Sequence, residues 1–170
     1  MESVITLREP SVQDAAEVWS LLHRAGGLDV NTPYCYLLLC DMFRSSCVIA
    51  ESDGKPVGFV SAFVKPENMN ILFVWQAAVD PAHQGKGIGR SMLNELLNRS
   101  YIVPIRYLEA TVGESNTASR RMFEAFAAAR DTHLQNVDGG GYPSELFPGH
   151  GHEPEPLVRI GPFLDRQPNR

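Results

Sequence analysis

Apolar and polar positions along the chain follow two periods, one that predicts strands and one that predicts helices. Short apolar runs bounded by turn residues predict strands. These runs lie at residues 4–7, 47–50, 57–64, 71–79, 105–112 and 157–160. Segments with apolar residues three and four positions apart predict helices. These segments lie at about residues 15–25, 33–39, 88–97 and 118–126.

The order of the elements predicts an α/β fold in which helices flank a mixed sheet. Strands dominate the first half, and from residue 71 the chain follows a strand-loop-helix-strand-helix order. Asp53-Gly54 between two apolar runs predicts a β-hairpin. Beyond Arg130 glycine and proline become frequent. We therefore expect a single domain over residues 1–170, with an irregular C-terminal segment from about residue 131.

Composition narrows the class of protein. The chain has 170 residues with 15 basic and 20 acidic side chains, a net charge of −5, so nothing favours nucleic acid or an anionic membrane as a partner. No run approaches the roughly 20 apolar residues that span a bilayer. Residues 1–4 lack the basic and apolar regions of a signal peptide. The three cysteines are an odd number without a C-x-x-C pair, which favours reduced thiols in the cytoplasm.

The segment that carries chemistry is the glycine-rich stretch at residues 84–90. Glycines at three of its positions let the backbone approach a ligand closely, and the predicted helix that follows presents unpaired N–H groups. Together they predict a site for a phosphate or pyrophosphate. The stretch lacks the GxxxxGK[ST] of a P-loop, and Arg90 stands where a dinucleotide fingerprint ends in glycine or alanine.

The pattern Gln84-x-x-Gly87-x-Gly89 resembles the pyrophosphate loop of the GNAT superfamily of acetyltransferases. Residues 116–123 resemble the second cofactor motif of that superfamily. The resemblance implies a mostly antiparallel mixed sheet flanked by helices, with the acetyl-CoA loop between a central strand and a helix. The residues that it implies for cofactor binding are Ala77, Val79, Gln84, Gly85, Lys86, Gly87, Ile88, Gly89, Arg90, Asn116 and Phe123.

Residues 33–40, 73–79, 108–112 and 151–153 resemble a narrower family, the diaminobutyrate acetyltransferases of ectoine biosynthesis. That resemblance implies acetyl transfer from acetyl-CoA to the γ-amino group of L-2,4-diaminobutyrate, and a homodimer. We expect direct transfer within a ternary complex, because no histidine accompanies the cysteines in a nucleophile motif. We expect no metal. The alternatives are a GNAT enzyme for another small amine or a protein N-terminus, and a CoA-binding module without catalysis.

Acidic and aromatic side chains are the candidates for a site that binds a diamine. Glu109, on a predicted strand, is expected to bind a cation or remove a proton; the alternative is a structural carboxylate paired with backbone or arginine. Asp29 is expected to anchor an amine, unless it is a simple loop aspartate. Tyr34 and Trp75 are expected to wall the pocket and offer cation–π contact, or else to pack in the core. Thr111, which shares the predicted face of Glu109, is expected to hydrogen-bond the substrate, unless it is simply one of the threonines that are common in strands.

Two further positions bear on proton transfer. On the resemblance, His152 is expected to cover the acceptor site or act as a base, with a bland surface histidine as the alternative. Phe123 stands where many GNAT enzymes have a tyrosine that protonates the leaving thiolate. An ordinary thiol has a pKa of about 8.5, so a thiolate can leave without full protonation, and the general acid stays unassigned.

Overall fold

The computed structural model describes residues 4–164; residues 1–3, on which the signal-peptide expectation partly rests, and 165–170 lie outside the described residues. In chain order the strands and helices are β1 Ile5–Arg8, α1 Ala15–Ala25, α2 Pro33–Asp41, β2 Cys47–Ser52, β3 Lys55–Lys65, β4 Asn68–Val79, α3 Ile88–Asn98, β5 Tyr107–Thr111, α4 Thr117–Ala128, β6 Leu134–Tyr142 and β7 Glu155–Ile160.

The strand order is β1-β2-β3-β4-β5-β7-β6. β5 lies parallel to β4, whereas β2 with β1 and β3, and β7 with β5 and β6, are antiparallel. The mixed, mostly antiparallel fold expected from the sequence is therefore confirmed. By internal contacts the chain forms two compact units. The first comprises the residues up to Phe63 and Val74–Arg99, and the second Val64–Phe73 and the residues from Ser100 onward.

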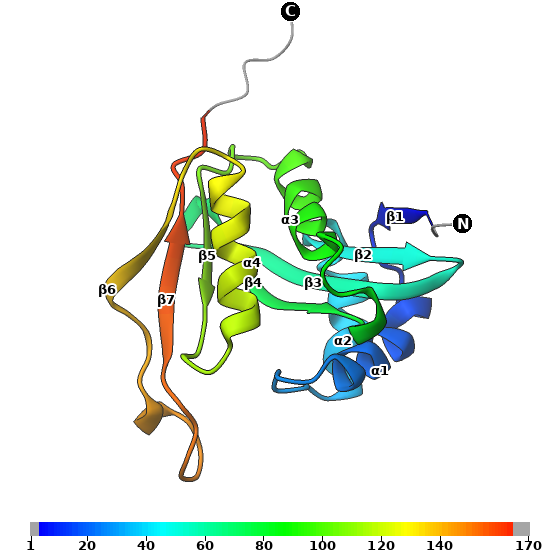
Figure 1. Cartoon of the computed structure of the whole chain (residues 1–170), viewed down its shortest axis with the longest axis horizontal. Helices are drawn as coiled ribbons and strands as arrows, with labels where there is room; N and C mark the ends of the chain where they lie inside the picture. Colours follow the sequence, from blue (N-terminus) through cyan, green and yellow to red (C-terminus); the bar gives the residue numbers. More distant parts are fainter. Residues whose placement is uncertain (1–3, 165–170) are drawn as a thin grey trace, which may run out of the picture. The chain divides into compact units, whose positions relative to one another are not determined.

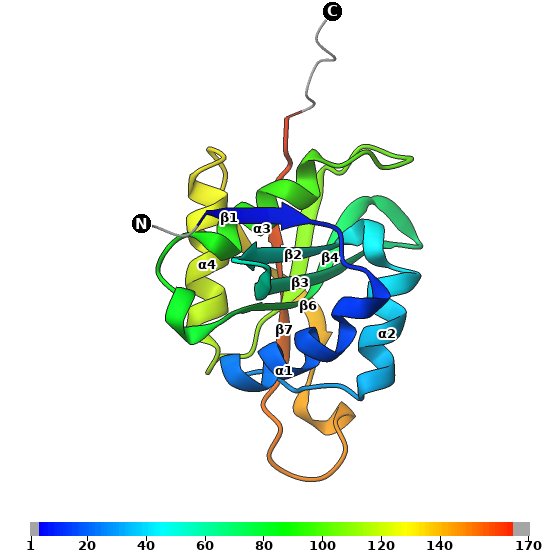
Figure 2. The same ribbon diagram turned by 90° about the vertical axis from the view of Figure 1, so that its right-hand side faces the viewer.

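The first unit packs helices on both faces of its strands. One face of the β2–β3 hairpin buries Ile49 and Phe59 against α1 and α2. On the other face Met92 of α3 lies against Gly58, where an added Cβ would come within 3.0 Å of the methionine methyl group. Figure 1 shows α3 on one side of β2 and β3 with α1 and α2 on the other, and Figure 2 shows β1, β2 and β3 side by side. Both faces of the β2–β3 hairpin are therefore covered by helices.

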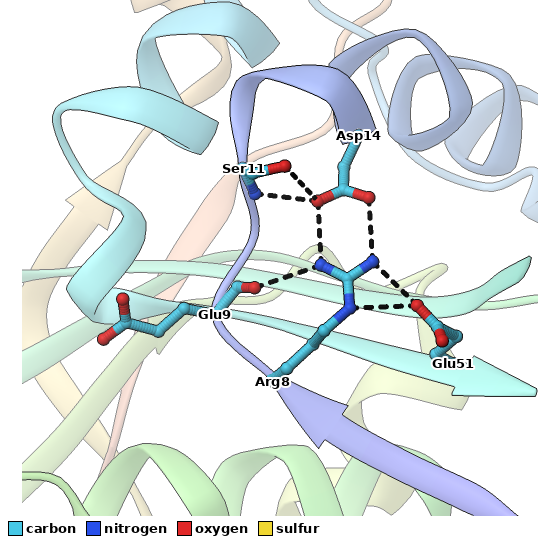
Figure 3. A network of polar contacts seen from close by, with 5 residues as sticks. All are labelled: Arg8, Glu9, Ser11, Asp14 and Glu51. Atoms are coloured by element: carbon cyan, nitrogen blue, oxygen red, sulfur yellow. Dashed lines mark hydrogen bonds and ion pairs between the residues drawn. The ribbon is translucent and has the colours of Figure 1, made fainter. Parts of the chain in front are cut away.

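An arginine-centred network fixes the start of the first unit (Figure 3). The Arg8 guanidinium donates to both carboxylate oxygens of Asp14 at 2.8 Å and to Glu51 Oε2 at 2.7 and 2.9 Å. Asp14 also accepts from the Ser11 backbone N–H at 2.7 Å. These hydrogen bonds, the arginine first, hold the pKa of Asp14 below its usual range. The network therefore joins β1, β2 and the turn that leads into α1.

The second unit is built on β5 and β7. Residues Leu108–Thr111 of β5 pair with Leu157–Ile160 of β7, and β6 pairs with the other edge of β7. Phe126 of α4 meets Phe163, just after β7, edge to face with ring centroids 6.2 Å apart. The strands and α4 are drawn in Figure 1 in green to red.

The C-terminal segment is not irregular from residue 131 as expected, because β6 occupies Leu134–Tyr142. Its sequence hides the strand: glycines break the apolar alternation, and a register shift separates Asn136 from Gly141. The glycines fit the close approach of β7. An added Cβ at Gly141 would lie 2.1 Å from the Glu155 carbonyl oxygen, and φ there is +90°. Pairing with β7, a tertiary interaction, overrides the weak local strand preference.

Candidate functional site

The chain leaves β4 through a fixed turn in the first unit. The Asp80 N–H donates to the Val57 carbonyl oxygen at 2.8 Å, and the Asp80 carboxylate accepts from the Ala82 N–H at 3.0 Å. Arg24 pairs with the same carboxylate at 3.2 Å. The hydrogen bond from Ala82, followed by Arg24, lowers the pKa of Asp80. The carboxylate thus caps a short 3₁₀ turn and sets the direction of the glycine-rich stretch.

The glycine-rich stretch has the geometry of an anion-binding loop. Gln84 folds back, its Nε2 donating to the Val79 carbonyl oxygen at 3.1 Å. Gly85 and Gly87 have φ of +77° and +75°, values that favour glycine, and Gly87 is the N-cap of α3. Residues 84–87 and Arg90 are exposed, whereas Ile88 and Gly89 are buried. The N-terminal N–H groups of α3 therefore follow an exposed, tightly turned loop, as pyrophosphate binding requires.

The acceptor-site candidates of the first unit lie on three segments. Asp29 lies in the loop between α1 and α2, where its carbonyl oxygen accepts from Gln76 Nε2 at 2.8 Å. Tyr34, in the first turn of α2, and Trp75, on β4, are 67% and 44% exposed. Neither aromatic is thus a buried core residue, which was the alternative for both. Ala77 on β4 is half-buried.

Glu109 in the second unit is a fully buried carboxylate between two cations. Its Oε1 accepts from Arg159 Nη2 and Nε at 2.6 and 2.8 Å, and its Oε2 accepts from Lys65 Nζ at 2.8 Å. Arg159 also lies over the Tyr107 ring, 5.2 Å from its centroid. The observed pairing is that of the structural alternative for Glu109. Both carboxylate oxygens of Glu109 are therefore paired with cations.

His152 is held in one orientation by the segment around it. Its ring stacks on Phe147, with centroids 3.7 Å apart and an interplanar angle of 5°. Its Nδ1 lies 2.6 Å from the Glu153 carbonyl oxygen. Because a carbonyl oxygen only accepts, Nδ1 carries the hydrogen, and the lone pair of the neutral imidazole is on Nε2. This tautomer suits a base that works through Nε2.

Glu153 joins the His152 segment to the start of α4. Its carboxylate accepts from the backbone N–H of Ser115 at 3.0 Å and from the Ser115 hydroxyl. These bonds lower the pKa of Glu153. The next residue, Asn116, is the N-cap of α4, its side chain accepting from the Ser119 N–H at 3.2 Å. The hydrogen bonds of Glu153 thus connect the His152 segment to the second cofactor motif within one unit.

The remaining candidates of the second unit differ in burial. Phe123 is 3% exposed on α4, within the apolar interior. Thr111 is half-buried at the end of β5, opposite Leu157 of β7.

Among residues 4–164 no group of three or more His, Cys, Asp or Glu side chains could hold a metal ion. No helix in that range is long and apolar enough to cross a membrane.

Several polar residues at these sites were not predicted from the sequence. Gln76 is a buried amide within the otherwise apolar run at residues 71–79, and that contrast was the available signal. Lys65 and Arg159 gave no signal, because their relation to Glu109 depends on strand order. Glu153 has no signal of its own in the sequence, because its contact with Ser115 joins positions 38 residues apart.

Comparison with known proteins gives consistent relatives. The family model of the acetyltransferase (GNAT) family matches residues 15–128. The L-2,4-diaminobutyric acid acetyltransferase of Virgibacillus pantothenticus is 46% identical over 154 residues, covering 91% of this chain and 96% of the relative. That of Halalkalibacterium halodurans is 39% identical over 163 residues, covering 96% and 85%. The structure is similar to diaminobutyrate acetyltransferase EctA from Paenibacillus lautus in complex with its substrate L-2,4-diaminobutyric acid and coenzyme A. Their TM-score is 0.90 and their identity 43%, and the match covers 98% of this chain and all of the other.

Proposed function

The chain belongs to the acetyltransferase (GNAT) family, and from this premise we propose that it transfers the acetyl group of acetyl-CoA to the γ-amino group of L-2,4-diaminobutyrate. The observation that carries the proposal is the likeness, over nearly the whole chain, to a protein solved with diaminobutyric acid and coenzyme A. The product is the acetylated precursor of ectoine. The exposure of residues 84–87 supports binding of the donor, and the exposure of Asp29 supports binding of an amine.

The donor, acetyl-CoA, is proposed to bind at the end of β4 and the start of α3. The loop from Gln84 to Arg90 takes the pyrophosphate, because its glycines bring backbone N–H groups to an exposed helix N-terminus. Backbone groups of Ala77 and Val79 take the pantetheine arm and the oxyanion that forms as the amine attacks the thioester carbon. The second cofactor motif, which includes Asn116 and Phe123, lies in the second unit.

The acceptor is proposed to be held by charge and by aromatic faces. Diaminobutyrate carries two ammonium groups and one carboxylate, so an exposed carboxylate such as Asp29 binds one of the ammonium groups. The exposed rings of Tyr34 and Trp75 offer cation–π contact to an ammonium group. Thr111 offers a hydroxyl for hydrogen bonding.

The reaction requires that the attacking ammonium group lose a proton, since its ordinary pKa is about 10.4. We assign this step to His152, whose Nε2 accepts the proton, directly or through one water, when the ring is neutral. The amine nitrogen then bonds to the carbonyl carbon, the C–S bond breaks, and CoA leaves as thiolate. The nitrogen loses its second proton as the amide forms, and that proton passes to the thiolate or to water. Because Glu109 is fully buried and paired with Lys65 and Arg159, we propose that it acts through its negative charge and that it does not remove the proton.

The test follows thiol release from acetyl-CoA with L-2,4-diaminobutyrate, ornithine, lysine and putrescine as acceptors. Mass spectrometry then locates the acetyl group. Faster release with diaminobutyrate, with the acetyl group on the γ-nitrogen, is the expected result. Preference for putrescine, which lacks a carboxylate, would transfer the proposal to a polyamine enzyme. Saturable acetyl-CoA binding without release to any acceptor would indicate a CoA-binding module.

We also propose a homodimer in the cytoplasm. The support is the family resemblance, the preference of soluble oligomers for two-fold symmetry, and three free cysteines, Cys35, Cys40 and Cys47. Size-exclusion chromatography with light scattering tests the assembly. A mass near 18.8 kDa across the working concentration range would contradict it.

A further inference from the structure

A buried hydrogen-bonded chain in the first unit joins the loop between α1 and α2 to strand β4. The Asn31 backbone N–H donates to the Tyr36 phenol oxygen at 3.1 Å, and that hydroxyl donates to Gln76 Oε1 at 3.0 Å. The other end of the amide, Nε2, donates to the Asp29 carbonyl oxygen at 2.8 Å. Two side chains thus hold two backbone groups of one loop.

The direction of every bond in this chain is fixed by the groups at its ends. An N–H group at Asn31 can only donate and a carbonyl oxygen at Asp29 can only accept. The phenol therefore gives its hydrogen to Oε1, and the amide cannot be reversed without placing oxygen against oxygen. Tyr36 is fully buried and Gln76 is 5% exposed, so lost bonds are not simply replaced by water.

The strand end of the chain is itself well anchored. The Gln76 backbone N–H donates to the Ser61 hydroxyl at 3.2 Å, and Ser61 is fully buried on β3. On β4, Gln76 lies between Trp75 and Ala77, the residues assigned to the acceptor and the acyl group. The Gln76 amide therefore fixes the position of the Asp29 loop relative to β4, the strand on which acyl transfer is proposed to occur.

We propose that Gln76 and Tyr36 are positioning residues that place Asp29 for binding of the acceptor amine. The inference rests on the proposed function, because it gives a role to the Asp29 carboxylate in that reaction. The loop needs such a tether, since Gly26 and Gly27 at its start both have positive φ, +69° and +71°, and flexible glycines do not fix a direction alone.

The first test is Gln76→Glu, which keeps the shape of the side chain but replaces the Nε2 donor by an oxygen. We expect the KM for diaminobutyrate to rise about tenfold, the equivalent of one lost buried hydrogen bond. The KM for acetyl-CoA is expected to stay within about twofold. Tyr36→Phe deletes a single oxygen and is expected to raise the same KM, which keeps the proposal testable if Gln76→Glu does not fold.

The matched control is Ser46→Ala, which removes a different buried hydrogen bond of the first unit, the one to the Ala62 carbonyl oxygen at 2.6 Å, and none of the bonds that hold Gln76 or the loop. It is expected to lower thermal stability but to leave the KM for diaminobutyrate unchanged. The second control is a double-mutant cycle with Asp29→Ala. Because Gln76 acts through Asp29, Gln76→Glu is expected to add little to the KM effect once the carboxylate is gone.

The results separate this inference from the proposed function. A wild-type protein that does not acetylate diaminobutyrate refutes the proposed function. A wild-type protein that does, with Gln76→Glu and Tyr36→Phe both at the wild-type KM, refutes the positioning role. The positioning role is also refuted if Gln76→Glu raises the KM for diaminobutyrate and the KM for acetyl-CoA equally. Full additivity of Gln76→Glu with Asp29→Ala refutes it too, since a general structural defect behaves in that way.

Discussion

Glu109 offers the sharpest prediction, because Glu109→Gln changes one buried charge with almost no change of shape. The amide oxygen can keep the hydrogen bonds from Arg159, but the amide nitrogen then faces Lys65 Nζ, donor against donor. Removing one partner of a buried ion pair costs about 3–5 kcal/mol when the other charge stays buried. Here the Lys65 and Arg159 side chains are 35% and 36% exposed, so water replaces part of the lost interaction.

We therefore expect Glu109→Gln to lower the free energy of unfolding by about 2 kcal/mol, with a Tm fall of about 4–8 °C for a chain of this size. Urea unfolding at pH 7, followed by circular dichroism and by tryptophan fluorescence, measures the change and tests two-state behaviour. Activity per folded molecule is measured on the same samples.

The matched control is Lys65→Met, which removes an ammonium group that is one-third exposed. It is expected to cost about 0.5–1 kcal/mol, because Arg159 still neutralises the carboxylate. In the double variant the new amide no longer faces an ammonium group, so the combined cost should fall about 1 kcal/mol short of the sum. A loss below about 0.5 kcal/mol for Glu109→Gln, or strict additivity in the cycle, would refute the reasoning from burial and pairing.

Three other expectations concern stability and thiol chemistry. Asp14→Asn should lower the free energy of unfolding by about 1 kcal/mol at pH 7, and because the folded-state pKa of Asp14 is lowered, this loss should shrink as the pH falls below about 4. A loss that stays constant in urea unfolding down to pH 2.5 would contradict this. Gly141→Ala should cost about 3 kcal/mol, since its Cβ meets a β7 carbonyl oxygen, whereas Gly139→Ala, with open space around it, should cost about 1 kcal/mol. Equal losses of the two variants in urea unfolding would contradict this. Burial raises the pKa of Cys40 to about 12 and that of Cys47 to about 11. A disulfide reagent at pH 8 should therefore label both thiols at least about a hundredfold more slowly in the native than in the unfolded protein, and rapid labelling of the native protein would contradict this.

Local signals in the sequence were sufficient to predict the helices and strands in the first half of the chain. The Asp53-Gly54 hairpin forms as predicted, with both residues at positive φ, and Pro33 begins α2. The boundaries of other strands moved by a few residues: β4 begins at Asn68 instead of residue 71. β6 was missed because its residues have no local preference for a strand and depend on β7 for their hydrogen bonds.

The candidate site was predictable where a motif is continuous in sequence. The loop at residues 84–90 has the backbone geometry that its glycines indicated. Pairings such as Glu109 with Lys65 and Arg159 depend on strands that are neighbours only after folding. The orientation of His152 depends on Phe147 and on a backbone carbonyl, neither of which a residue-type pattern reveals.

The tether between the α1–α2 loop and β4 has a consequence for how the acceptor preference could change. Tyr36 and Gln76 grip the loop only by its main chain, at one N–H and one carbonyl oxygen. Main-chain groups are present whatever residue stands at positions 29 and 31, proline at 31 excepted. Side chains there can therefore be exchanged while the loop keeps its path. A laboratory library at position 29 would therefore sample new acceptor amines while the hydrogen bonds that hold the loop stay in place.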